Sequence, residues 1–192
     1  MPTRHGAHAT VARCPAIDEV LRLGDVFFFT VNLADRKSRL LAEEYERLRR
    51  AVDLARSRHP FLTLAFCVLP DHWHVIWRMP ENDADFGLRW RVIKHAFSLG
   101  LAPAATRSPS KIAKREKGIW QRRFWEHQIR DDADLQRHVD YIHFNPVKHG
   151  HAKIVVREWR YSSFHTYVER GGLPPDWGGC ADAVSAQWGE RD

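Results

Sequence analysis

The stretch FLTLAFCVLPDHWHVIWRM, residues 61–79, decides the fold. Its first part, residues 61–69, is apolar on both faces, which is typical of a strand inside a sheet. Pro70 and Asp71 then predict a turn, and the aromatic and β-branched run that follows predicts another strand. The two strands are therefore expected to form an antiparallel hairpin.

The segments that flank this hairpin predict two more strands and two helices. Residues 25–33, DVFFFTVNL, are dense in aromatic and β-branched residues and predict the first strand. Residues 41–58 carry apolar side chains at steps of three and four, which predicts an amphipathic helix. Residues 86–97 repeat that spacing after the hairpin, and residues 119–130 alternate large apolar and polar residues, as a fourth strand does.

Residues 131–145 predict a third helix with acidic residues in its first turn. Asn145 precedes Pro146, which disfavours the helical conformation at Asn145, so we expect this helix to end there. The order β-α-β-β-α-β predicts an α+β protein with a ferredoxin-like split β-α-β antiparallel sheet covered by helices. The third helix is then an added C-terminal helix that carries Tyr141.

A chain of 192 residues, 44% of them hydrophobic, is expected to form one domain with tails. We expect a flexible N-terminal segment at residues 1–22, the domain at residues 23–170 and a C-terminal tail at residues 171–192. Within the domain, residues 100–118 are rich in Ala, Pro, Ser and basic residues and predict a mobile basic loop.

The charge of the chain favours polyanionic partners. Thirty Lys and Arg residues against 24 Asp and Glu residues give a formal net charge of +6. The three cysteines, Cys14, Cys67 and Cys180, are scattered without metal-type spacing, which favours a reducing, cytoplasmic location. The N-terminal residues lack the apolar region of a signal peptide, and no apolar run is long enough to span a bilayer, so we expect no membrane association.

His72 and His74 are the most informative pair of side chains in the hairpin. Side chains alternate along a strand, so the two imidazoles point to the same face about 6.6 to 7 Å apart along the backbone. They could converge on one metal ion, which would need a third ligand from elsewhere. The alternative is that each is a core histidine that bonds a backbone carbonyl.

Tyr141 and Asn145 offer the remaining groups. They lie four residues apart, so a helix that reaches Asn145 places a phenol and an amide oxygen on one face. A nucleophile and a metal ligand would then sit together. The alternative is structural, with Tyr141 in the core and Asn145 as the end of the helix.

PDHWH at residues 70–74, followed by YIHFNPVKHG at residues 141–150, resembles the HUH-type single-tyrosine transposases. Within that superfamily the chain is most similar to the REP-associated tyrosine transposases. Further similarity lies in FFFTVNL, IWQRRFWEHQIRD and WRYSSFH, so the resemblance covers residues 25–178. The long loop at residues 100–118 departs from this resemblance, because the corresponding loop of such proteins can be much shorter.

The resemblance implies a metal-dependent single-stranded DNA endonuclease and strand transferase that acts on REP-type palindromic hairpins. It implies a 5′-phosphotyrosine intermediate at Tyr141, with His72, His74 and Asn145 as ligands of Mg²⁺ or Mn²⁺. By softness alone, two imidazoles would suit zinc or another transition metal better than magnesium. We expect no nucleotide cofactor and a monomer, with a dimer as the alternative.

Basic residues interleaved with aromatic ones are expected to bind phosphates while unpaired bases stack on the rings. The residues to which we assign DNA binding are Arg89, Arg91, Lys94, Arg122, Arg123 and Lys148. For the arginines and Lys94 the alternative is an ordinary solvated charge, with the aromatic rings between them in the core. For Lys148 the alternative is a lysine that complements the dipole at the end of its helix. Two other functions stay open: a non-catalytic hairpin-binding protein, and a replication-initiator or relaxase-like HUH nuclease.

Overall fold

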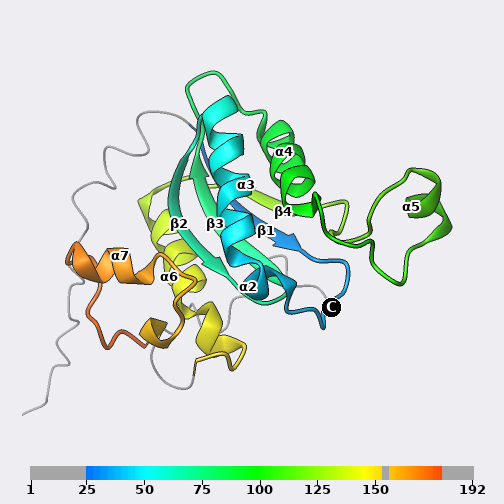
Figure 1. Cartoon of the computed structure of the whole chain (residues 1–192). Coiled ribbons are helices and arrows are strands. Elements are labelled where there is room, and N and C mark those ends of the chain that lie inside the picture. The colour runs from blue at the N-terminus through cyan, green and yellow to red at the C-terminus, as the bar shows by residue number, and fades with distance from the viewer. Residues whose placement is uncertain (1–24, 153–155, 179–192) are drawn as a thin grey trace, which may run out of the picture.

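The structure, a computed structural model, describes residues 25–152 and 156–178 (Figure 1). Strands and helices follow one another in the predicted order, which confirms the α+β class. The elements are β1 (Val26–Asn32), α2 (Leu40–Glu43), α3 (Tyr45–Arg58), β2 (Leu62–Val68), β3 (His72–Arg78), α4 (Phe86–Ser98), α5 (Pro109–Ala113), β4 (Trp125–Gln128), α6 (Asp132–Lys148), the 3-10 helix η1 (Val156–Glu158) and α7 (Phe164–Glu169).

The four strands form one antiparallel sheet in the order β2-β3-β1-β4. β2 and β3 are the predicted hairpin, and β3 and β1 are the two central strands. α3 and α4 pack together over one face of the sheet, and α6 covers the other face (Figure 1). The predicted ferredoxin-like plan with an added C-terminal helix is therefore confirmed.

Strand alternation divides the side chains of the sheet between two cores. On β1, Phe27 and Phe29 join the core under α3 and α4, whereas Phe28 joins the core under α6. On β3, Trp73 and the odd-numbered residues after it also join the first core. The even-numbered residues of β3, which include both histidines, therefore face α6.

The prediction that α6 ends at Asn145 is wrong, because the helix continues through Pro146 to Lys148. Its end is closed by Gly150, which has a φ of +70°. The backbone N–H of His151 donates to the Pro146 carbonyl at 2.8 Å, which is the long hydrogen bond of a Schellman cap. This cap, together with the burial of Asn145 and Pro146, stabilises a last turn that local preferences disfavour.

The fourth strand is shorter than its predicted span of residues 119–130. Only Trp125–Gln128 pairs along β1, while Trp120 forms an isolated bridge with Leu33. The residues between them connect the two pairings without strand structure, so the alternation in the sequence extends further than the ladder does.

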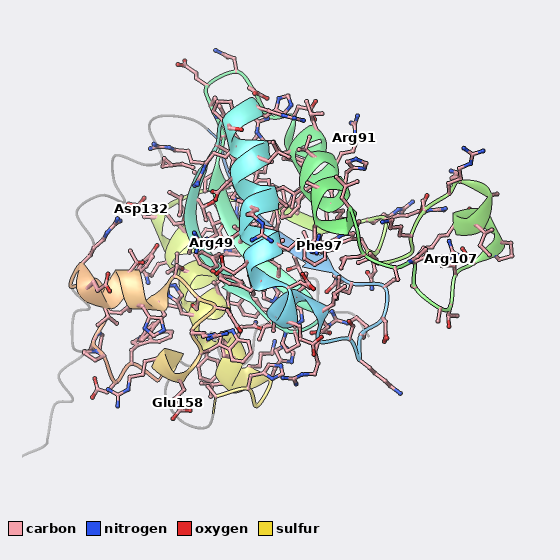
Figure 2. The ribbon with its side chains drawn as sticks, viewed as in Figure 1. Arg49, Arg91, Phe97, Arg107, Asp132 and Glu158 are labelled. Carbon is pink, nitrogen blue, oxygen red and sulfur yellow. The ribbon has the colours of Figure 1, made fainter. Side chains whose placement is uncertain are left out.

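Residues 100–118, here called the arm, carry a short helix, α5, and project from the rest of the fold (Figures 1 and 2). The two sides of the arm are joined at its base, where the Ala104 N–H donates to the Lys117 carbonyl at 2.7 Å. Lys117 Nζ also donates to the carbonyls of Ser98 and Leu101. The predicted basic loop therefore contains one short helix, α5.

The expected C-terminal tail begins inside the fold. Leu173 is buried against Phe164, and Trp177 packs on the same cluster. Residues 179–192 and the expected N-terminal segment, 1–22, lie outside the described residues. None of the helices in the described part of the chain is long and apolar enough to cross a membrane.

Candidate active site

The two histidines of β3 lie against each other on the side of the sheet that α6 covers. The ring centroids of His72 and His74 are 4.8 Å apart, and both side chains are buried. Nδ1 of His72 lies 2.8 Å from Asp71 Oδ1, and Nδ1 of His74 lies 2.9 Å from Thr30 Oγ1. Thr30 reaches His74 because the two residues are register partners on β1 and β3. With Nδ1 of His72 engaged by Asp71, Nε2 is the nitrogen of that ring that remains for a ligand.

The chemistry of these groups fits a divalent cation. Nε2 of His72 is buried and has no hydrogen-bond partner within residues 25–152 and 156–178. Buried polar atoms are normally bonded, so this nitrogen indicates a missing partner. Histidines that bind metals characteristically donate their other N–H to a carboxylate, as His72 does to Asp71.

Asp71 connects the first histidine to a basic residue. Asp71 Oδ2 lies 3.0 Å from Arg36 Nη1, which also donates to Asn32 Oδ1 at 2.6 Å. Partial burial acts to raise the pKa of Asp71, but the hydrogen bond from His72 and the charge of Arg36 hold it below its usual value. Burial lowers the pKa of His72 more than Asp71 raises it. His72 is therefore neutral at pH 7, as a metal ligand must be.

One face of α6 lies along this histidine pair. Tyr141, Asn145 and His149 follow at steps of four residues and so share that face. The ring centroid of Tyr141 is 5.2 Å from that of His74, and the ring centroid of His149 is 5.1 Å from that of His72. Asn145, which is fully buried, occupies the helical position between them. The structure thus brings together the four residues that the sequence singled out.

Lys148 adds a positive charge beside the phenol. Its Nζ lies 4.9 Å from the centroid of the Tyr141 ring, within the range of a cation–π interaction. A cation at this place can attract a phosphate that approaches Tyr141. Of the six predicted DNA-binding residues, Lys148 is the one that the structure places against the tyrosine.

Arg89 is a correction to the predicted DNA surface. Its side chain is 1% exposed and is held by Asp83 Oδ2 at 2.7 Å and by the Pro60 carbonyl at 2.7 Å. A guanidinium with these partners cannot reach a phosphate without unfolding the start of α4. The helical spacing placed Arg89 beside the solvated charges of α4, but it did not reveal that Arg89 anchors the loop before the helix.

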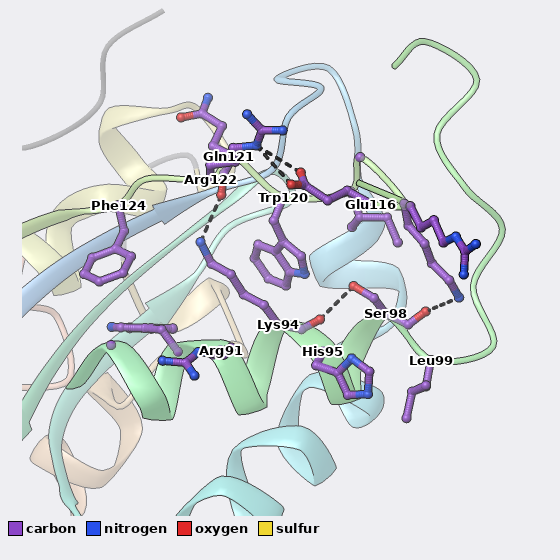
Figure 3. Close-up of a pocket in the computed structure, with 16 residues that line it drawn as sticks. Arg91, Lys94, His95, Ser98, Leu99, Glu116, Trp120, Gln121, Arg122 and Phe124 are labelled. Atoms are coloured by element: carbon purple, nitrogen blue, oxygen red, sulfur yellow. Dashed lines mark hydrogen bonds and ion pairs between the residues drawn. The ribbon is translucent and has the colours of Figure 1, made fainter. Parts of the chain in front are cut away.

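Lys94 lines a pocket of about 610 Å³ between α4 and the chain that leads into β4 (Figure 3). Its Nζ donates to the Gln121 carbonyl at 3.0 Å and lies over the rings of Trp120 and Phe124. Burial lowers the pKa of Lys94 to about 8. This pocket lies on the face of the sheet opposite the histidine pair.

The other three predicted DNA-binding arginines are exposed. Arg91 lies on the outer side of α4 and lines the same pocket (Figures 2 and 3). Arg122 also lines the pocket and pairs with Glu116 at 3.1 Å, whereas Arg123 is exposed beside it. These side chains are accessible to DNA, but they lie away from Tyr141.

A second group with the composition of a metal site lies where β4 meets α6. Ligand atoms of His127, Asp134 and His138 all lie within 4.8 Å of one another. Asp134 already accepts hydrogen bonds from His127, Arg130 and Arg137. Burial acts to raise the pKa of Asp134, but the hydrogen bonds from His127 and the Arg130 N–H hold it well below its usual range.

The sequence patterns did not predict the residues that hold the histidine pair. Asp71 precedes His72 in the chain, so the PDH tripeptide could have predicted the contact between these two side chains. Thr30 and Arg36 become partners only through the register of β1 on β3 and the path of the chain after β1. Such contacts cannot be read from spacing in one strand.

Known proteins match this chain over most of its length, although no family model matches it. A REP-associated tyrosine transposase of Escherichia coli is 46% identical over 170 residues, which are 88% of this chain and 92% of that protein. A relative from Haemophilus influenzae in the same family is also 46% identical, over 161 residues that cover 83% of this chain and 90% of its own. A solved structure of a REP-associated tyrosine transposase bound to a REP hairpin matches with a TM-score of 0.75 and 45% identity, over 88% of this chain and 93% of that chain.

The matched fold, with a tyrosine on α6 opposite the histidine pair, defines the class as a tyrosine transposase. Both relatives cover well over two thirds of the chain at 46% identity. The chain belongs to the family of REP-associated tyrosine transposases, and it is an enzyme.

Proposed function

We propose that this chain is a metal-dependent single-stranded DNA endonuclease and strand transferase that acts on REP-type palindromic hairpins through a 5′-phosphotyrosine. The observation that carries the proposal is the 5.2 Å separation of the Tyr141 and His74 rings, beside a buried His72 nitrogen. A nucleophile and a cation-binding pair are then within reach of one phosphate.

His72, His74 and Asn145 would hold the metal. When bound, a divalent cation supplies Lewis-acid stabilisation of the charge on the phosphate oxygens. The three ligands are neutral, which leaves the charge of the ion available to an anionic substrate. We propose Mg²⁺ or Mn²⁺ from the family resemblance, although ligand softness favours a transition metal.

We place the metal at this pair rather than at His127, Asp134 and His138. The guanidinium groups of Arg130 and Arg137 already contact Asp134, and their positive charges oppose a cation there.

Tyr141 is the proposed nucleophile. Its phenol oxygen attacks the phosphorus in line, the O–P bond forms, and the bond from phosphorus to the 3′ oxygen breaks. The phenol loses its proton and the departing 3′ oxygen gains one. With a pKa near 10, only ~0.1% of an ordinary tyrosine is ionised at pH 7, so a nearby positive charge such as that of Lys148 favours the reaction.

The covalent link keeps the phosphate reactive. Phenolate is a better leaving group than an alkoxide, so a different 3′-hydroxyl can attack the phosphotyrosine and release Tyr141. Strand transfer by this route needs no nucleotide cofactor. We further propose that the enzyme is cytoplasmic, because its proposed substrate is DNA, and that the enzyme acts as a monomer.

An adduct assay tests the proposal. Labelled hairpin DNA with single-stranded flanks is incubated with the protein and Mn²⁺, and a denaturing gel should show protein-linked DNA. Tyr141→Phe should abolish the adduct, whereas Tyr45→Phe, a tyrosine on α3, should not. An undiminished adduct in Tyr141→Phe would exclude Tyr141 as nucleophile, and hairpin binding without any adduct would favour the non-catalytic alternative. If origin-type DNA forms the adduct and REP-type hairpins do not, the result would favour the hypothesis of a replication-initiator or relaxase-like nuclease.

A further inference from the structure

Beyond the histidine pair, aromatic rings continue in a row across the surface. The His149 ring lies 5.1 Å from His72, the His151 ring lies 6.4 Å from His149, and the Trp159 ring lies 5.2 Å from His151, all between centroids. We call His149, His151 and Trp159 the ring row. It starts at the proposed metal site and leads away from it.

The members of the ring row are held in place by the backbone. His149 and His151 flank Gly150 in the Schellman cap of α6, where the N–H of His149 donates to the Asn145 carbonyl at 3.0 Å. The Trp159 indole N–H donates to the Val68 carbonyl at 2.8 Å, at the end of β2. These contacts fix the backbone that carries His149 and His151, and they fix the ring of Trp159.

The ring row is accessible and lies in basic surroundings. His149 and His151 are exposed, whereas Trp159 is half-buried and packs in part against the core under α6. Three exposed arginines lie near the row. Arg39 acts electrostatically on His151, and Arg157 and Arg160 are close to Trp159 along the chain. Exposed rings beside cations are the features with which proteins bind single-stranded nucleic acid.

We propose that the ring row binds the single-stranded DNA that flanks the scissile phosphate, with bases stacked on His149, His151 and Trp159. This inference rests on the proposed function, because the strand must leave the site from Tyr141. The pocket around Lys94 lies on the other face of the sheet and cannot receive the nucleotides nearest the cleaved bond.

Binding measurements on two probes test the ring row. The probes are a palindromic hairpin with single-stranded flanks and the same hairpin without them, and affinity is measured by fluorescence anisotropy in the Tyr141→Phe background. His151→Ala should weaken binding of the flanked hairpin about fivefold or more, since stacking on one side chain contributes roughly that factor at its lower limit. The flankless hairpin should bind as before, and His151→Tyr should restore affinity because it keeps a ring.

His95→Ala is the matched control, since His95 is an exposed histidine on α4, on the opposite side of the sheet. Trp159→Ala would also remove the hydrogen bond to the Val68 carbonyl, so a crosslinking measurement takes its place. 5-Iodouracil in the flank should photocrosslink to His149, His151 or Trp159. The proposal is overturned if His151→Ala binds the flanked hairpin as tightly as the protein with His151 does. It is also overturned if the flank crosslinks only to residues outside the ring row. If wild-type protein forms the adduct while these results are negative, the ring row fails and the proposed function stands. Absence of the adduct in the wild type contradicts the proposed function instead.

Discussion

A fall in pH should destabilise the fold through a buried histidine of α6, His143. His143 is fully buried, its Nε2 lies 2.9 Å from Ser163 Oγ, and burial lowers its pKa to about 3. An unfolded histidine has a pKa near 6.5 and binds a proton that the folded state rejects. The stability contributed by this neutral histidine is therefore complete above pH 6.5 and is lost as the pH falls toward the folded value.

The size of the loss follows from the two pKa values. At pH 5.5 the unfolded histidine is one unit below its pKa, while the folded one is still far above its own. At 1.36 kcal/mol per unit, protonation of the unfolded state costs about 1.4 kcal/mol of stability relative to pH 8. Because the folded pKa is so low, this figure depends almost entirely on the unfolded value.

Urea denaturation followed by tryptophan fluorescence measures the effect, in EDTA so that metal binding does not contribute. His143→Gln keeps a polar partner for Ser163 but cannot titrate in this range. The loss of unfolding free energy between pH 8 and pH 5.5 should be about 1.4 kcal/mol smaller in His143→Gln than in the wild type. The same loss in both proteins would refute the argument that His143 is buried in its neutral form.

Three further results are expected. Asp71→Asn should weaken Mn²⁺ binding about 10- to 100-fold in a calorimetric or paramagnetic titration, because it removes the carboxylate that orients a ligand, whereas Asp53→Asn on α3 should not. Gly150→Ala should lower the unfolding free energy by about 1 kcal/mol because of its φ of +70°, whereas Gly87→Ala should be neutral or stabilising in the same urea assay. Arg89→Ala should cost about 3 kcal/mol of stability with unchanged affinity of the folded protein for hairpin DNA; a selective loss of affinity would restore Arg89 to the DNA surface.

The main features of the fold could be predicted because strand alternation and helical spacing are strong in this chain. The hairpin at residues 61–79 and its same-face histidines follow from period-two geometry alone. The four-residue step from Tyr141 to Asn145 likewise placed both on one helical face. The packing of this helical face against β3 depends on tertiary structure and does not follow from spacing in the sequence. It was expected only because of the family resemblance.

The errors arose where long-range contacts override local preference. Pro146 lies inside α6 because the cap at Gly150 and burial of the last turn outweigh its local effect. Arg89 looked like a surface cation because its partners, Asp83 and Pro60, lie in loops whose positions the sequence does not give. Charge in a sequence shows how many cations exist, but not which of them are exposed.

The way in which the arm is closed at its base affects how the family can diversify. Ala104 and Lys117 bring its two ends together, so residues between them can be inserted or removed while α4 and β4 keep their places. Loop length changes the closure entropy only slowly, which makes such changes inexpensive in free energy. Evolution can therefore vary the reach of this appendage independently of the catalytic centre.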